Sequence, residues 1–221
     1  MKKHMRARNK LAREIARKRS SSSRSNRPIT LAPASRPDLQ ELVDAPDETL
    51  SAEYKSWLDL QGRLEDRANL ARHIAAIANH GGGNIIFGFT DDLHYAGPNP
   101  FPHVKITRDL VSSVVKKYLE PTLQCSVRVV RSLAGNDHPV MVVPPHGPTP
   151  IGAKASGPNG KGITQGTYYT RKIGPESAPI LTYSEWMPII RRCAMHARSE
   201  LVSDLYEVIR TSGLNIRKPG K

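Results

Sequence analysis

Residues 48–92 read ETLSAEYKSWLDLQGRLEDRANLARHIAAIANHGGGNIIFGFTDD, and this stretch decides the fold. It contains two segments with strand character. In the first, Glu53 and Lys55 are separated by one residue, so on a strand they share a face while Tyr54 points to the other. The second, Asn84 to Thr90, is a compact apolar run that ends on Asp91 and Asp92.

The sequence between these strands predicts a helix over Leu64 to His80. Leu70, Ile74 and Ile77 follow one another at the spacing of a single helical stripe. Three glycines at 81–83 then end it, because glycine adopts the positive φ of a helix C-terminus. A strand–helix–strand unit of this length favours adjacent parallel strands joined by a crossover. That arrangement brings the acidic residues near both strand ends to one edge.

The same stretch carries the motifs of a known family. Glu48 is followed by Glu53-Tyr54-Lys55, then by AIANHGG at 76–82 and GFTD at 88–91. With VMVVPPHGPTP and GTYYTRKIG further on, residues 37–195 resemble the Schlafen-type AlbA domain. The resemblance implies an α+β domain with a mixed sheet flanked by helices.

The resemblance also implies a site. The catalytic acids of ribonuclease-active Schlafens correspond to Glu48, Glu53 and Asp91 of this chain. Clustered carboxylates repel one another unless a cation lies between them, so these three would hold Mg²⁺ or Mn²⁺, and Lys55 would assist catalysis. We expect Glu53→Ala or Asp91→Ala to abolish cleavage and to leave the melting temperature nearly unchanged.

Three functions are compatible with these features. The first is a nucleic-acid-binding protein that acts as a metal-dependent endoribonuclease on structured RNA such as tRNA. The second is a non-catalytic DNA- or RNA-binding regulatory module of the same fold, in which the acids are structural. The third is an interaction protein whose basic arm docks on a partner or a membrane. As the partner we expect nucleic acid, with RNA favoured over DNA.

The charge is concentrated at the N-terminus. The 221 residues carry a formal charge of +13, and residues 1–28 hold eleven Lys and Arg against one Glu, which gives +10 of that total. We therefore divide the chain into a basic arm (1–36), the domain (37–195) and a C-terminal helix with a basic tail (196–221). The residues predicted to contact nucleic acid are Lys2, Lys3, Arg6, Arg8, Lys10, Arg13, Arg17, Lys18, Arg19, Lys154, Lys161, Arg171 and Lys172.

Several classes of protein do not fit the sequence. Two cysteines, Cys125 and Cys193, are too few for a disulfide framework or a four-thiolate zinc site, and the histidines are dispersed, so we expect no zinc. GPNGKG at 157–162 lacks the remaining Walker residues, so ATP binding is not supported. No apolar run approaches about 20 residues, and we expect a soluble, cytoplasmic protein.

Beyond residue 92 the pattern predicts further elements. We expect a helix over 107–119, strands over 125–130, 139–143 and 167–173, and helices over 182–193 and 197–210. The Gly/Pro-rich segment 144–166 is predicted to be a long functional or mobile loop. In the last helix, Leu201, Leu205, Val208 and Ile209 form an apolar stripe that either covers this domain or pairs with a second copy in a homodimer.

The arm gives the first testable prediction. Deleting residues 1–28 removes +10 of the +13 charge, so RNA binding should weaken and lose most of its salt dependence, because fewer counterions are released. Fluorescence anisotropy with labelled RNA over a salt series measures both quantities. If the truncated protein binds as tightly, with the same salt slope, the arm serves another purpose.

Overall fold

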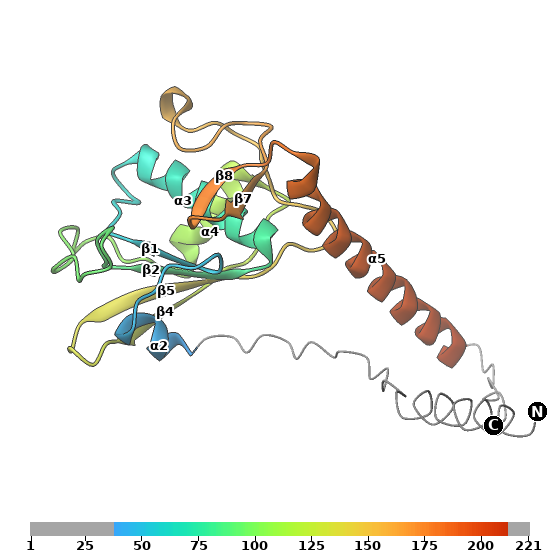
Figure 1. Cartoon of the computed structure of the whole chain (residues 1–221), viewed down its shortest axis with the longest axis horizontal. Helices are drawn as coiled ribbons and strands as arrows, with labels where there is room; N and C mark the ends of the chain where they lie inside the picture. The colour runs from blue at the N-terminus through green and yellow to red at the C-terminus, as the bar shows by residue number, and fades with distance from the viewer. Residues whose placement is uncertain (1–37, 212–221) are drawn as a thin grey trace, which may run out of the picture. The chain divides into compact units, whose positions relative to one another are not determined.

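The computed structural model describes residues 38–211, which form a mixed sheet with helices on both faces (Figure 1). The four strands lie in the order β1 (Ala52–Lys55), β2 (Gly83–Phe87), β5 (Asp137–Val143) and β4 (Ser126–Arg131). β1 and β2 are parallel, whereas β5 pairs antiparallel with both β2 and β4. The predicted α+β architecture is confirmed.

The strand–helix–strand unit forms as the sequence predicts. α3 (Leu64–His80) connects β1 to β2, and Glu53 lies opposite Ile85 in the parallel register. Gly81 ends the helix with a φ of 133°, and its N–H donates to the carbonyls of Ile77 and Ala78. Gly83 permits a close approach, since a Cβ there would lie 2.1 Å from the backbone oxygen of Ser51.

Side-chain alternation divides the apolar residues between the two faces of the sheet. Ile85, Phe87 and Met141 point into a core closed by α3 and α4 (Arg108–Tyr118). On the other face, Tyr54 and Ile86 pack with α2 (Leu39–Asp44). Burying each large apolar side chain contributes about 1.5–3 kcal/mol. Because Tyr54 faces α2, its neighbours Glu53 and Lys55 face α3.

A β-hairpin covers the side of α3 that faces away from the sheet. It consists of β7 (Tyr169–Lys172) and β8 (Glu176–Pro179), and both strands pack against α3. The buried side chain of Asn79 fixes this layer, because its Nδ2 donates to the carbonyls of Ile151 and Tyr169 and its Oδ1 accepts from the N–H of Ile151. The sequence predicted β7, but it did not predict β8.

The structure of residues 144–166 differs from the prediction of a long functional or mobile loop. They contain β6 (Gly152–Ala153), which pairs antiparallel with β3 (Leu119–Glu120), and the short 3-10 helix η1 (Pro158–Gly160). Ile151 and Ile163 are buried in the main core. The segment is therefore a packed part of the domain, since its few apolar residues anchor it against the helices.

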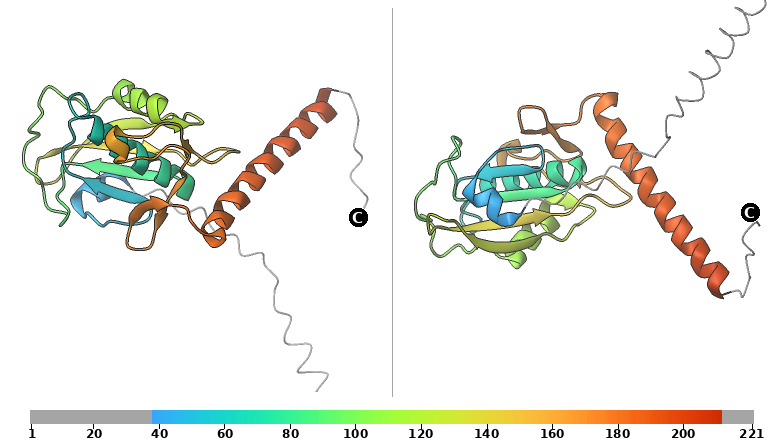
Figure 2. Two further views of the ribbon diagram at one scale, coloured as in Figure 1. Left: turned by 90° about the horizontal axis from the view of Figure 1, so that it is seen from above. Right: turned by 60° about the horizontal axis from the view of Figure 1, so that its bottom comes forward.

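The C-terminal region is one helix rather than the two that we predicted. α5 runs without a break over Tyr183–Thr211. The predicted capping pair forms at its start, where Glu185 Oε2 accepts from the N–H of Thr182 at 3.1 Å. Its first turns dock on the domain through Trp186, which packs edge-on against Tyr168, and through the buried Ile189. Beyond that region α5 extends away from the sheet (Figure 2).

No helix among residues 38–211 is long and apolar enough to cross a membrane.

Candidate functional site

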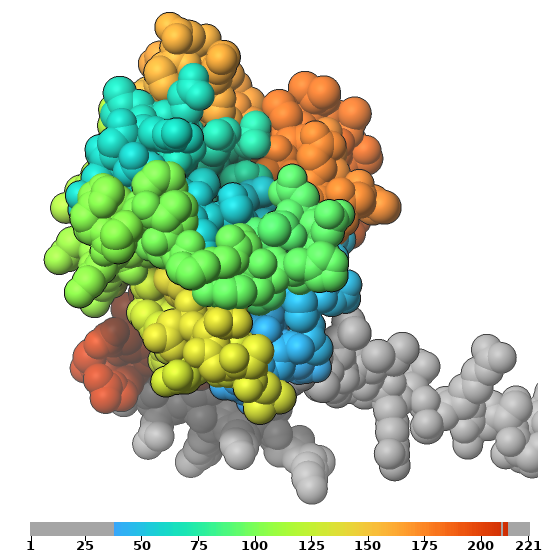
Figure 3. Space-filling model, turned by 90° about the vertical axis from the view of Figure 1, so that its left-hand side faces the viewer, coloured from blue at the N-terminus to red at the C-terminus, as the bar shows by residue number. Residues whose placement is uncertain are grey.

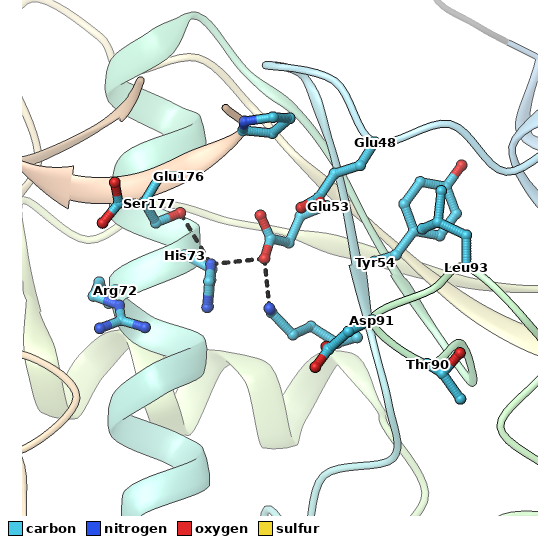
Figure 4. A pocket seen from close by; sticks show the side chains of 12 residues that line it. Glu48, Glu53, Tyr54, Arg72, His73, Thr90, Asp91, Leu93, Glu176 and Ser177 are labelled. Carbon is cyan, nitrogen blue, oxygen red and sulfur yellow. Dashed lines mark hydrogen bonds and ion pairs between the residues drawn. The ribbon is translucent and has the colours of Figure 1, made fainter. Parts of the chain in front are cut away.

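A polar pocket of about 300 Å³ opens where β1, α3, the turn after β2 and the β7–β8 hairpin meet (Figure 4). Its charged and polar lining consists of Glu48, Glu53, Lys55, Arg72, His73, Thr90, Asp91, Glu176 and Ser177. All four residues of the predicted catalytic set thus line one pocket.

Each element supplies its side chains for a local reason. Alternation along β1 turns Glu53 and Lys55 towards α3, which presents Arg72 and His73. The turn after β2 forms another wall with Thr90 and Asp91. In the space-filling view the segment that follows, drawn in green, crosses this face between the yellow β4–β5 hairpin and the start of α3 (Figure 3).

Glu53 is the centre of the ionic network in the pocket. Its side chain is only 2% exposed, and both carboxylate oxygens are engaged. Oε1 lies 2.7 Å from the Lys55 ammonium and 3.2 Å from His73 Nδ1. Oε2 accepts from the guanidinium of Arg171, whose side chain is fully buried. A buried carboxylate is tolerated only with such compensation.

This environment shifts the pKa values of the two central groups in the same direction. Burial alone would raise the pKa of Glu53, but the hydrogen bond from His73 and the ammonium of Lys55 outweigh burial and lower it to about 2. Burial lowers the pKa of His73, more than Glu53 raises it. At neutral pH an ionised Glu53 therefore accepts a hydrogen bond from Nδ1–H of a neutral imidazole, a tautomer that follows because a carboxylate can only accept.

Arg171 links the hairpin to β1 and to the segment before it. Besides Glu53, its guanidinium donates to the carbonyl of Thr49 at 3.0 Å and to Ser177 Oγ at 3.1 Å, and it lies 3.5 Å from Glu48 Oε1. Arg171 was predicted to contact nucleic acid, and the structure corrects this prediction. A guanidinium whose side chain is fully buried cannot reach a ligand outside the domain.

The remaining predicted acids are in different states. Glu48 is one-third exposed, and burial together with the nearby charge of Glu53 raises its pKa. Asp91 is exposed at the rim of the pocket. Within residues 38–211 no three acidic, histidine or cysteine side chains are arranged to hold a metal ion. As these side chains stand they do not fit a metal, because Lys55, His73 and Arg171 already occupy the oxygens of Glu53.

Five residues of the charged and polar lining were not predicted from sequence, and two of them, Arg72 and His73, come from α3. His73 contacts both Glu53 and Ser177 Oγ, at 2.9 Å from the latter. Its position signals this role, since it lies three residues after Leu70 and four before Ile77, on the buried stripe of α3. The position of Arg72 could be found in the same way, because it directly precedes His73 and therefore lies at the edge of that stripe.

The other residues predicted to bind nucleic acid lie outside the pocket lining. Lys154 and Lys161 are exposed, and Lys161 lies 3.8 Å from Glu65. Lys172 pairs with Glu185 at 2.8 Å, so it joins the hairpin to α5. The nine arm residues, Lys2 to Arg19, fall outside the described part of the chain.

The fold and pocket define a class: a mixed α+β domain in which a strand–helix–strand unit and a hairpin enclose an ionic pocket. The family described as Schlafen, AlbA_2 matches residues 48–174, more than half of the 221 residues, so the chain belongs to this family. The matched range contains most of the pocket network, from Glu48 to Arg171, but stops just before Glu176 and Ser177. The family indicates an interaction with nucleic acid. Among curated proteins none matches the chain.

The network predicts that Glu53 is important for stability. Glu53→Gln leaves the charge of Arg171 buried without its partner, so it should lower the free energy of unfolding by about 3–5 kcal/mol at pH 7. Urea denaturation measures this. Glu176→Gln is the matched control, since Glu176 is exposed in the same pocket and its replacement should change stability by less than about 0.5 kcal/mol.

The same pair of proteins predicts a pH dependence. Because the folded-state pKa of Glu53 is about 2, below its ordinary value of 4.5, its charge stabilises the fold above pH 4.5. That contribution is lost as the pH falls from 4.5 towards 2. The stability difference between wild type and Glu53→Gln should therefore shrink over that interval. A difference that is constant with pH, or absent at pH 7, would contradict the network.

Proposed function

We propose that this protein binds nucleic acid, RNA in preference to DNA, and that its pocket holds a backbone phosphate. The observation that supports this proposal is the state of Arg72. It lines the pocket, yet its guanidinium forms no ion pair or hydrogen bond with another residue of the described range. A planar guanidinium with open donors matches the oxygens of a phosphate.

Lys55 gives the pocket a second cation. Its side chain is 28% exposed, so its ammonium can contact Glu53 and still be reached from solvent. The carboxylate of Glu53 does not repel a phosphate as a free carboxylate would, because Lys55 and Arg171 compensate its charge. The preference for RNA rests on the resemblance to ribonuclease-active Schlafens. The basic N-terminal sequence would add affinity that depends on salt but not on base sequence.

Replacing Arg72 tests the phosphate contact. Arg72→Gln should weaken binding of single-stranded RNA to a similar extent for all sequences and lower the salt slope by about 1, as expected for one lost phosphate contact. Anisotropy titrations between about 50 and 200 mM salt measure the slope. Arg63→Gln is the matched control, since Arg63 is exposed just before α3 and is not part of the pocket lining. Equal slopes for both variants would contradict the assignment of Arg72.

A second function, metal-dependent endoribonuclease activity on structured RNA such as tRNA, is favoured by one observation. Glu48 and Glu53, from β1 and the residues that lead into it, and Asp91, from the turn after β2, line the same pocket. Cleavage through a divalent ion would require Glu53 to exchange Lys55 or Arg171 for that ion. We therefore place this activity second to binding.

Asp91 is the residue on which cleavage is best tested. Its side chain is exposed, so Asp91→Asn should leave the fold intact, whereas substitution of Glu53 should destabilise it. If the three acids act together, cleavage of labelled tRNA requires Mn²⁺, stops with chelator and is lost in Asp91→Asn. The neighbouring exposed Asp92, which is not part of the pocket lining, provides the control Asp92→Asn. Cleavage that survives chelation or the Asp91 substitution would contradict a metal site at these acids.

A further inference from the structure

The C-terminal half of α5 presents apolar side chains that pack against nothing within the described domain. Leu201 is 63% exposed, Leu205 55% and Val208 59%. These residues are four and then three positions apart, so they lie on one stripe of the helix. Val202, 43% exposed, borders the stripe. The sequence left two alternatives for this stripe. These exposures do not agree with the one in which the stripe covers the chain's own domain.

An exposed apolar stripe on a projecting helix requires a partner on physical grounds. Isolated helices are only marginally stable in water, and most helices gain stability by packing an apolar face. In α5 that packing is limited to the first turns, around Trp186 and Ile189. Contiguous exposed apolar residues on a soluble protein mark an interaction surface.

The charges along α5 indicate which partner fits. Two exposed arginines, Arg191 and Arg198, precede Leu201, and the exposed acidic residues Glu200, Asp204 and Glu207 lie beside and beyond it, followed by Arg210 in the last turn. This order disfavours a nucleic acid or an anionic membrane, because the acidic half would repel either. It matches a second copy of the same helix in the opposite direction, which sets each basic half against an acidic half. A parallel pair would set like charges together.

We propose that α5 pairs with α5 of a second copy in an antiparallel arrangement through the stripe of Leu201, Leu205 and Val208. An antiparallel pair that crosses near Leu201 places Arg198 level with Asp204 of the second copy, because each is three residues from the crossing point. The two-fold axis repeats this ion pair on the other side. The inference is independent of the proposed function, since it uses none of the pocket residues.

Pairing would have a functional consequence whatever ligand the domain binds. Two domains and two N-terminal arms would be joined in one particle. A ligand held by one domain would then be presented to the other at high effective concentration, which raises the overall affinity without a new contact.

The test is the mass of the full chain after nuclease treatment, measured by sedimentation equilibrium at micromolar concentration. We expect about twice the monomer mass of 24.4 kDa. Leu201→Asp combined with Leu205→Asp should give a monomer. Ser199→Asp combined with Ser203→Asp adds the same charges with the same spacing on the opposite face and should remain a dimer. A monomeric wild type, or a dimer that survives the leucine substitutions, would overturn the proposal.

A charge exchange tests the direction of pairing. Arg198→Glu or Asp204→Arg alone should raise the dissociation constant by about tenfold or more, because each sets like charges together. The double variant restores opposite charges and should recover affinity close to that of the wild type. Circular dichroism confirms in each case that α5 remains helical. If the double variant is as weak as the two single changes combined, the antiparallel arrangement is wrong.

Discussion

The buried ion pair between Glu53 and Arg171 is the interaction on which the rest of this structure depends. It joins β1 of the sheet to β7 of the hairpin, across α3, and His73 of α3 contacts the same carboxylate. The sheet, α3 and the hairpin therefore all contact the carboxylate of Glu53. Desolvating two ions is costly, and the cost is offset because Lys55 also contacts Glu53, while Ser177 and the carbonyl of Thr49 accept hydrogen bonds from Arg171.

This constraint also determines what the pocket can do. The Glu53 carboxylate contacts three cationic or hydrogen-bonding partners, so its main role is structural. It also holds Lys55 at the pocket wall. Arg72, on the other side of His73, retains open donors. Under the function that we propose, the pocket binds an anion rather than a metal, although its acids come from the positions that the resemblance connects with ribonuclease activity.

Local periodicity accounts for what the sequence could predict. The helical spacing of Leu70, Ile74 and Ile77 predicted α3, and alternation along the strand predicted that Glu53 and Lys55 share a face. Both patterns depend only on neighbouring residues. The partner of Glu53 lies 118 residues away, and no local pattern pairs an acid with one of many arginines. For the same reason the expectation that Glu53→Ala would leave stability unchanged treated a buried group as a surface acid. The sequence predicted two helices where α5 is continuous. The part of a helix that projects from the domain has no buried face, so it lacks the burial pattern by which a helix is recognised in a sequence.

A double-mutant cycle between Glu53 and Arg171 tests the central claim most directly. Free energies of unfolding for wild type, Glu53→Gln, Arg171→Met and the double variant give the coupling energy of the pair without the separate effects of each substitution. We predict that the double variant loses less stability than the sum of the two single changes, with a coupling of about 2–3 kcal/mol, near the upper end for contacting residues. Additive losses, within about 0.5 kcal/mol, would contradict the account.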